Sequence, residues 1–342
     1  MFRKLLSKVS RSLPFHWLVH LSRLNLVSPF YHMVSEVAPN HVNYLYPVVS
    51  PKRFIADLEF MLKHFIPINV NEIPLIQAGQ KKLSKPAIFL SFDDGFREIS
   101  TVVAPILLEK GIPATFFVSP AFVDNKDMLY RCKLSLIANK IDELGSEFEV
   151  PDFLLLLWGS EVKNTKVFKK RLFHLKAENN QLIENIAHAF QVDLKDYLKS
   201  VSPYLTLENL TNLAKKGFAI GAHSYNHPYF SDITIDEQIE EVLTSLDWVK
   251  SNITDQPRIF AFPFTDYGVS GDFYRYFLND NSSTLDMMFG TAGMKLSPSN
   301  KIIQRVPMEV DGLKAHQILG GEYLYYAAKR MIGKNKMVIP ND

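Results

Sequence analysis

Two short segments of the sequence carry side chains that could perform catalysis. The first places Asp93 and Asp94 together before Gly95, and the second places His223 and His227 four residues apart. Neighbouring side chains at the end of a strand point in different directions, so one carboxylate can bind a cation while the other faces a substrate or a water molecule. Two imidazoles held in one loop can bind the same divalent ion.

Each segment has an ordinary interpretation when it is taken alone. An Asp-Asp-Gly sequence after a strand is common in solvated turns, and histidines in polar loops are often free of metal. The two segments together are more specific, because one carboxylate and two imidazoles form a metal-binding triad that leaves positions open for water and substrate. The sequence therefore predicts a metal centre built from both segments.

Strands must end at these two segments if their side chains are to meet. The apolar run 87–92 follows Pro86 and is short, so it predicts a buried strand that ends at the first segment. A helical pattern over 99–108 and a second apolar run over 114–118 complete a strand–helix–strand unit. Such a unit implies a parallel sheet with a right-handed crossover, in which ligands gather at the carboxyl ends of the strands.

The same alternation of strand and helix returns later in the chain. Thr206 is expected to begin a helix, and a strand over 218–221 leads into the second segment. Thr234 and Glu237 have the spacing of a capping box at the start of a further helix, and 259–262 is expected to be the next strand. Alternation over about 300 residues favours one barrel-like α/β domain over two independent domains.

The domain organisation follows from these patterns. We expect an amino-terminal segment over 1–26 and a single domain over 27–342, with a helical insertion at about 125–205, where no strand is evident. The segment 1–26 holds five lysines and arginines among apolar residues near helical spacing. It has neither the uninterrupted apolar run nor the cleavage site of an export signal. It predicts, in a cytoplasmic protein, a helix that either packs on its own domain or lies on an anionic membrane surface, and in the second case the protein is peripheral at the inner face of the membrane.

The charge composition excludes some partners. The 342 residues include 38 Lys plus Arg and 36 Asp plus Glu, which gives a formal net charge of +2 and no strong field for nucleic acid. The one cysteine, Cys132, has no partner for a disulfide within the chain. A chain of this length can bury a core that needs no covalent staple.

The two segments resemble motifs of the polysaccharide deacetylases of carbohydrate esterase family 4, also called the NodB homology domain. The range 91–95 is similar to the first motif, although the usual first residue is Thr and here it is Ser91. The range 223–228 matches the second motif, which reads His, Ser or Thr, two free positions, His and often Pro. The third motif resembles 261–264 without its usual arginine. The resemblance covers roughly residues 86–123 and 218–310, with an unusually long insertion between them.

The resemblance implies a distorted (β/α) barrel and a metal-dependent hydrolase that removes acetyl groups from N-acetylated sugars of a polysaccharide or its lipid-linked precursor. It implies that Asp94, His223 and His227 bind a divalent metal ion, with zinc the expected ion, and that Asp93 is the general base. It also implies that the backbone N–H of Phe264 helps to hold the oxyanion. The implied partner is an acetylated glycan.

Two roles of the family have no residue at the usual motif position. A proton must reach the leaving amine, and the family's histidine motif for this step is absent. We expect His32, in a short apolar stretch, to supply the proton, with His316 as the alternative. We expect Arg305, in the strand-like range 302–307, to replace the missing arginine, with Arg258 as the alternative.

Two other functions, sugar binding without catalysis and glycoside hydrolysis, are alternatives to deacetylation. A carbohydrate-binding protein on the same fold would explain the missing arginine and histidine, but it has no need of Asp93. A glycosidase needs two carboxyls about 5 to 10 Å apart on opposite sides of a bond, which the neighbouring Asp93 and Asp94 do not supply. Three tyrosines in the loops near the expected site are candidates for stacking on a sugar: Tyr225, Tyr229 and Tyr267.

Overall fold

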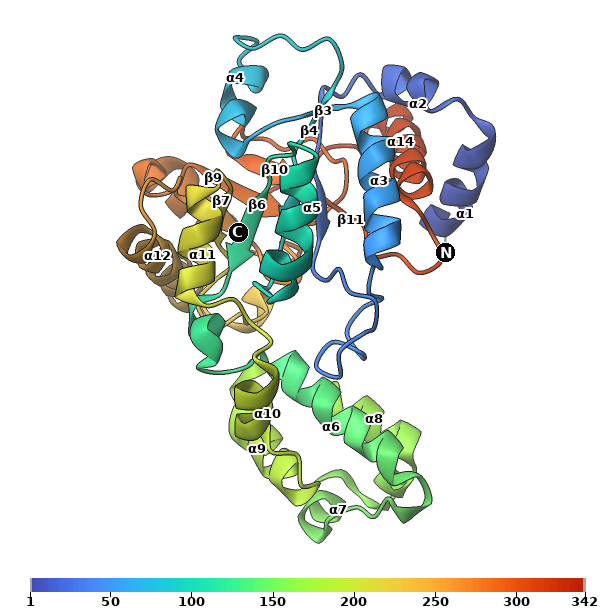
Figure 1. The fold of residues 1–342 in the computed structure, drawn as a ribbon, viewed down its shortest axis with the longest axis vertical. Coiled ribbons are helices and arrows are strands. Elements are labelled where there is room, and N and C mark those ends of the chain that lie inside the picture. Colours follow the sequence, from blue (N-terminus) through green and yellow to red (C-terminus); the bar gives the residue numbers. More distant parts are fainter. Residues whose placement is uncertain (1, 341–342) are drawn as a thin grey trace.

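The computed structural model describes residues 2–340, and its centre is an eight-stranded sheet (Figure 1). All neighbouring strands in this sheet are parallel. In spatial order they are β10 (Ile302–Gln304), β9 (Met287–Gly290), β8 (Ile259–Ala261), β7 (Ala219–Ala222), β6 (Thr115–Val118), β5 (Ser91–Phe92), β2 (Pro29–Tyr31) and β11 (Val306–Pro307). The expected parallel α/β barrel is confirmed. Residue 1 of the expected segment 1–26 and residues 341–342 of the expected domain lie outside the described residues.

The two edge strands of this sheet are consecutive in the chain, and only Arg305 separates them. β10 pairs with β9 at one edge, and β11 pairs with β2 at the other. The N–H of Arg305 donates to the carbonyl of Gly290 at 3.1 Å, whereas the N–H of Val306 donates to the carbonyl of Ser28 at 2.8 Å. The chain therefore passes from one edge of the sheet to the other at Arg305, which joins the edges into a barrel.

A second parallel sheet consists of β1 (Leu26–Val27), β4 (Ala87–Ile88) and β3 (Ile66–Pro67). The expectation of one strand over 87–92 is therefore wrong, because the first part of this run is β4 and the last part is β5 of the barrel. Every residue from 87 to 92 is buried. The hydrophobic pattern thus contains no sign of the change from one sheet to the other.

Helices surround the barrel, and those after Thr206 and Thr234 begin where the sequence predicts. The Ser50 side chain accepts a hydrogen bond from Arg53 N at the start of α3, and Thr206 and Thr234 form capping boxes at α11 and α12. The helix expected over 99–108 is a π-helical turn followed by α5. The bounds of these helices are α3 (Pro51–His64), α4 (Ile73–Gln77), α5 (Ala104–Glu109), α11 (Leu207–Lys215), α12 (Ile235–Asn252), α13 (Gly271–Arg275) and α14 (Ala315–Met331).

Between β6 and α11 the described chain contains no regular strand, and its α-helices project below the barrel in Figure 1. They are α6 (Tyr130–Leu144), α7 (Asp152–Trp158), α8 (Thr165–Leu172), α9 (Asn180–Ala189) and α10 (Leu194–Val201). These helices share an apolar core that includes Ile137, Phe168 and Ile186 and extends to Met33 and Phe96 outside them. An isolated bridge between Phe96 and Tyr204 ties the end of this part to the barrel.

The amino-terminal segment is two short helices, α1 (Phe2–Val9) and α2 (Phe15–Ser22), and both pack against α14. The approach to α14 is very close, because a Cβ atom at Gly320 would lie 2.8 Å from Ser10 and one at Gly321 would lie 2.3 Å from Ser7. Only glycine fits there. Among residues 2–340, no helix is both long enough and apolar enough to cross a bilayer.

Candidate active site

Asp94, His223 and His227 converge at the carboxyl end of the barrel strands. Asp94 follows β5, and both histidines follow β7. The Oδ1 atom of Asp94 lies 3.5 Å from Nε2 of His223 and 3.2 Å from Nε2 of His227. One potential ligand atom from each residue falls within 4.8 Å of the others, and all three side chains are buried. Among the described residues, this arrangement has the composition of a metal centre.

The backbone at these residues takes conformations that are rare outside glycine. Asp94, Ser224, His227 and Phe264 all have φ between 56° and 69°, in the left-handed region. The Ser224 Oγ atom accepts a hydrogen bond from His227 N at 3.0 Å, which holds the loop in this shape. Such conformations cost free energy and persist only where the surroundings impose them, so their concentration around the cluster supports a functional role.

The three side chains fit a divalent cation. The Nδ1 atom of His223 lies 2.9 Å from the carbonyl oxygen of Ala261, which can only accept. Nδ1 therefore carries the proton, and Nε2 directs its lone pair at Asp94. Both ring nitrogens of His227 are buried without a hydrogen-bond partner among the described residues. Burial also lowers the pKa of His227, which favours the neutral imidazole that metals bind.

Asp93 lies beside this cluster and is held by Arg305. The guanidinium donates to both carboxylate oxygens, at 2.7 and 2.8 Å, and to Ser91 Oγ at 3.1 Å. It is enclosed between the rings of Phe30 and Phe117, whose centres lie 4.4 and 5.2 Å away. Burial acts to raise the pKa of Asp93, but the charge and hydrogen bonds of Arg305, together with the nearby His223 and His32, outweigh it and the net shift is downward. Asp93 is thus kept as a carboxylate in a fixed orientation.

His32 follows β2 and is bound by a carboxylate that the sequence analysis did not identify. The Nδ1 atom of His32 hydrogen-bonds to Glu309, which also accepts from the backbone N–H groups of His32 and Met33 at 2.6 and 2.7 Å. Burial alone would lower the pKa of His32, but the negative charge of Glu309 and its hydrogen bond raise it to about 9. The His32 side chain is 22% exposed, whereas those of Asp93, Asp94, His223, His227 and Glu309 are at most 5% exposed.

Tyr46 connects His32 to the cluster. Its ring stacks on the imidazole of His32 with centres 4.5 Å apart, and its hydroxyl donates to Oδ2 of Asp94 at 3.2 Å. The tyrosine therefore binds one carboxylate oxygen of Asp94, and the other oxygen, Oδ1, faces the two histidines. Tyr46 lies in the irregular segment before α3, where sequence patterns give no signal for such a contact.

Phe264 forms another wall of the site. Its ring stacks on Tyr229 at 3.8 Å and meets the ring of His227 edge-on at 4.6 Å. Two residues at the start of α6, Tyr130 and Arg131, also approach the Phe264 ring, at 6.2 and 5.9 Å, so the insertion reaches the edge of the site. The backbone N–H of Phe264 has no acceptor among the described residues.

The family model of polysaccharide deacetylases matches residues 80–150 and 176–271. This match confirms the predicted resemblance to the polysaccharide deacetylase family. Among solved structures, the Streptococcus pyogenes deacetylase PplD in complex with acetate is 14% identical, with a TM-score of 0.55, over 87% of this chain and 97% of that one. The structure of IcaB from Ammonifex degensii is also 14% identical, with a TM-score of 0.54 over the same shares. At these identities, the similarity shows the shared fold. The curated proteins include no match.

Within this deacetylase fold, the alternative residues lie elsewhere. His316, at the start of α14, packs against Phe60 with ring centres 6.0 Å apart. Arg258 pairs with Asp247 at 2.8 Å on the surface. In the described structure, neither hydrogen-bonds to Asp93, Asp94, His223 or His227, whereas Arg305 bonds directly to Asp93. The sequence could have indicated Glu309, because it follows the strand β11 by two residues at the same end of the barrel.

The tyrosines proposed for sugar contact differ in their surroundings. Tyr229 stacks on Phe264 beside the cluster, whereas Tyr267 is 86% exposed. The N–H of Tyr225 and the N–H of Asn226 both donate to Oε2 of Glu241 on α12, at 2.7 and 2.8 Å. Glu241 therefore holds the loop between the two histidines, and the sequence analysis did not identify this role.

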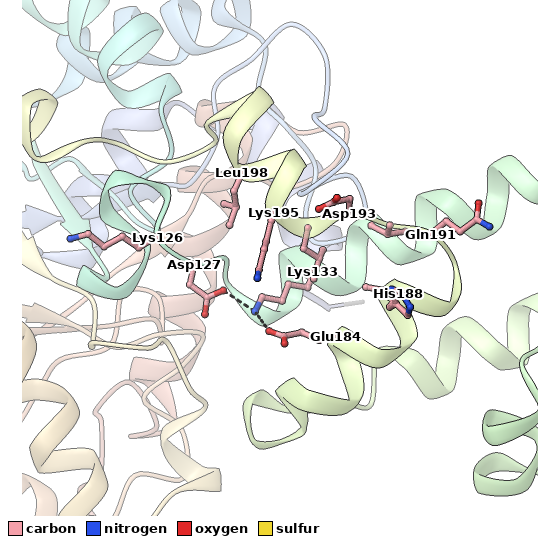
Figure 2. Close-up of a pocket in the computed structure, with 12 residues that line it drawn as sticks. Lys126, Asp127, Lys133, Glu184, His188, Gln191, Asp193, Lys195 and Leu198 are labelled. Atoms are coloured by element: carbon pink, nitrogen blue, oxygen red, sulfur yellow. Dashed lines mark hydrogen bonds and ion pairs between the residues drawn. The ribbon is translucent and has the colours of Figure 1, made fainter.

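The insertion contains a separate cavity of about 570 Å³, between α6, α9 and α10 (Figure 2). Lys133 is buried at its wall, and its ammonium group contacts Asp127 at 2.8 Å and Glu184 at 3.3 Å. Lys195 and Asp193 also line it, so charges of both signs surround the space. None of Asp93, Asp94, His223 and His227 lines this cavity.

Proposed function

We propose that the protein is a metal-dependent deacetylase that removes acetyl groups from N-acetylated sugars of a polysaccharide or its lipid-linked precursor. The observation that carries this proposal is the pair formed by the Asp94, His223 and His227 cluster and the neighbouring Asp93, which Arg305 holds ionised. The match to the polysaccharide deacetylase family supports the same reaction class.

Asp94, His223 and His227 would hold the metal ion, with zinc the expected ion for a site of one carboxylate and two imidazoles. When bound, the ion would supply Lewis acidity towards the acetyl carbonyl and the attacking water. Asp93 accepts a proton from this water as its oxygen attacks the carbonyl carbon. Arg305 keeps Asp93 in the orientation that this transfer needs.

The tetrahedral oxyanion accepts a hydrogen bond from the backbone N–H of Phe264. The bond between the carbonyl carbon and the sugar nitrogen then breaks, and His32 gives its proton to that nitrogen. The products are acetate and a free amine on the sugar. Glu309 supports this role of His32, because it holds the ring by Nδ1 and raises its pKa, which leaves Nε2 as the donor.

We further propose that the enzyme acts at the inner face of a membrane and contacts the membrane through residues 1–26. The concentration of basic residues in this segment supports the contact. We also propose that residues 27–342 act as one catalytic unit, with the helices of 125–205 as an insertion that contributes to substrate recognition, because Tyr130 and Arg131 reach Phe264.

A carbohydrate-binding protein on the same fold is the alternative. A binding protein has no use for a second buried carboxylate that is kept ionised by a dedicated arginine, so the Asp93–Arg305 pair favours the enzyme. The test is a metal analysis of the purified protein beside acetate release from N-acetylated oligosaccharides. We expect about one equivalent of divalent metal per chain, and acetate release that is lost on exhaustive chelation and restored by zinc. Acetate release that survives chelation would overturn the metal mechanism, and sugar binding without acetate release would favour the binding protein.

A further inference from the structure

The helix α2 exposes apolar side chains on the face that points away from the protein. Phe15 and Leu18 face inward, where Phe15 contacts the rings of Phe60 and Tyr323 at 4.8 and 5.7 Å. Trp17 and Leu21 lie four residues apart, so they share a different face, and they are 64% and 59% exposed. The packing of α2 on its own domain therefore leaves a large aromatic and an aliphatic side chain in water.

The end of α14 extends this apolar surface. Arg330 donates hydrogen bonds to the carbonyls of Leu21 and Ser22, at 3.5 and 3.3 Å, so the last turns of the two helices lie side by side. Directly after Arg330, Met331 is 83% exposed and Ile332 is 63% exposed. We call Trp17, Leu21, Met331 and Ile332 the α2–α14 surface. The helices α2 and α14 lie at the upper right of Figure 1, whereas the insertion projects at the bottom.

The charge around the α2–α14 surface has one sign. No acidic residue occurs in 2–35 or in 323–340. Beside α2 is a cavity of about 720 Å³. Six basic side chains and no acidic one line it: His16, His20, Arg23, Lys63, His64 and Lys85. In the cavity of Figure 2, Lys133 pairs with Asp127 and Glu184, whereas no carboxylate lines the cavity beside α2.

We infer that the α2–α14 surface binds a bilayer containing anionic phospholipid, with Trp17 and Leu21 in the interface and the basic cavity at the level of the phosphate headgroups. An exposed apolar stripe flanked by cations is the pattern of helices that lie in a membrane interface. Anionic headgroups complement a cavity in which all the ionisable side chains are basic. A soluble protein partner would not require both features at one place.

This inference identifies which part of the segment 1–26 meets the membrane and adds the carboxyl-terminal part of the chain. Ser7, in α1, and Ser10, directly after α1, are buried against Gly321 and Gly320. They face α14 and do not contribute to the exposed stripe. The binding surface is therefore formed by α2, the end of α14 and the lysines of the cavity.

Sedimentation with vesicles tests the inference. The full-length protein is mixed with vesicles of equal parts phosphatidylcholine and phosphatidylglycerol, and separately with vesicles of phosphatidylcholine alone. We expect sedimentation with the anionic vesicles only, and loss of it at high salt. The double variant Trp17→Ser, Leu21→Ser should bind the anionic vesicles at least about tenfold more weakly, because two apolar anchors are removed. In the double variant Lys63→Glu, Lys85→Glu, the affinity for the anionic vesicles should fall by about fivefold or more for each reversed charge.

Matched variants control for surface changes elsewhere. Leu156 and Leu157 are 88% and 56% exposed on α7, so Leu156→Ser, Leu157→Ser removes comparable apolar area from the insertion. Lys195→Glu reverses a charge in the cavity of Figure 2. Both controls should sediment like the unaltered protein. All the substituted side chains are solvent-exposed, so the variants should fold, which circular dichroism verifies.

The outcomes separate the inference from its rivals and from the proposed enzyme function. Failure of the unaltered protein to sediment, or equal sedimentation of the Trp17→Ser, Leu21→Ser variant, would overturn the inference. Thermal stabilisation by inorganic phosphate without sedimentation would overturn it too, because the cavity would then bind a free anion. The Asp93→Asn variant should sediment normally although its proposed catalysis is lost, so failure of membrane binding and failure of the enzyme function give different results.

Discussion

Arg305 donates to both carboxylate oxygens of Asp93 from a position 212 residues further along the chain. The arginine occupies the seam where β10 ends and β11 begins, so the same residue joins the edges of the barrel and orients the proposed base. This explains how the site keeps an arginine although the third motif has none. Orientation of Asp93 is thus linked to closure of the barrel.

Replacing Arg305 by methionine should destabilise the fold. The substitution would leave the carboxylate of Asp93 buried without its partner, which costs about 3 to 5 kcal/mol in the free energy of unfolding. Denaturant unfolding followed by circular dichroism measures this change. The control Arg258→Met removes an ion pair whose Asp247 partner is 65% exposed and a hydrogen bond to the carbonyl of Thr284, and it should cost about 1 to 2 kcal/mol. Equal losses of stability in the two variants would show that the buried carboxylate of Asp93 does not depend on Arg305.

Replacing Asp93 by asparagine should abolish turnover and spare the metal. Asparagine keeps the shape of the side chain but cannot accept the proton of water, so acetate release should fall by about 10² to 10⁴-fold. Metal content, measured by elemental analysis, should match that of the unaltered protein, because Asp94 and the two histidines are untouched. The exposed Asp247→Asn serves as the control. Unchanged acetate release would contradict the assignment of Asp93 as the base.

The sequence predicts the parts of the site that lie directly after barrel strands. Asp94 and His223 come after β5 and β7, and the parallel barrel brings these strand ends together. Tyr46 could not be predicted, because it reaches Asp94 from an irregular segment whose path depends on tertiary packing. Glu309 is an intermediate case, since a carboxylate just past the strand-like range 302–307 fits the rule of strand ends. The rule alone does not say that it would bind His32.

Two features of the fold could not be predicted from the sequence patterns, for a physical reason. The run 87–92 is buried throughout, and a uniformly apolar pattern looks the same whether one strand or two pass through the core. In the segment 1–26, apolar residues near helical spacing predict a single helix, but Pro14 precedes α2 and separates it from α1. The apolar residues of α2 then divide between a face on α14 and a face in water, a division that spacing alone does not reveal.

The Glu309→Gln variant should move the alkaline limit of the pH–rate profile to lower pH. His32 must carry a proton to give it to the leaving amine, and with its pKa raised to about 9 it stays protonated below that pH. Without the negative charge of Glu309, burial would pull the pKa back towards or below the ordinary value of 6.5. Acetate release of the variant should therefore decline at a pH about two units or more below that of the unaltered enzyme.

The measurement is acetate release against pH from 5 to about 10, at saturating metal. The control Asp311→Asn removes an exposed acid two residues away, and its alkaline limit should stay in place. If the Glu309→Gln profile keeps the same alkaline limit and loses only amplitude, His32 is not the group that titrates. In that case Glu309 acts only by holding the backbone N–H groups of His32 and Met33.

Glu241 should control metal affinity without touching the metal. Its carboxylate accepts from the backbone N–H groups of Tyr225 and Asn226, and from the Asn226 side chain at 3.0 Å. These residues lie between His223 and His227, so Glu241 fixes the distance and direction of the two imidazoles. Replacement by glutamine removes the charge from these hydrogen bonds and puts an NH₂ group where one acceptor was. The loop should loosen, and the affinity for zinc should fall about 10 to 100-fold, as for other residues that support metal ligands.

Competition with a chelator of known affinity measures this change, and saturating zinc distinguishes its cause. Because Asp93, Arg305 and His32 are intact in Glu241→Gln, acetate release at saturating zinc should recover most of its original value. The neighbouring Glu240 is exposed and has no hydrogen bond to the loop in the described structure, so Glu240→Gln should bind zinc normally. If Glu241→Gln binds zinc as tightly as the unaltered protein, the loop holds its shape through Ser224 Oγ and the left-handed backbone alone. A loss of acetate release that zinc does not reverse would instead show that Glu241 positions Tyr225 and its neighbours for the sugar.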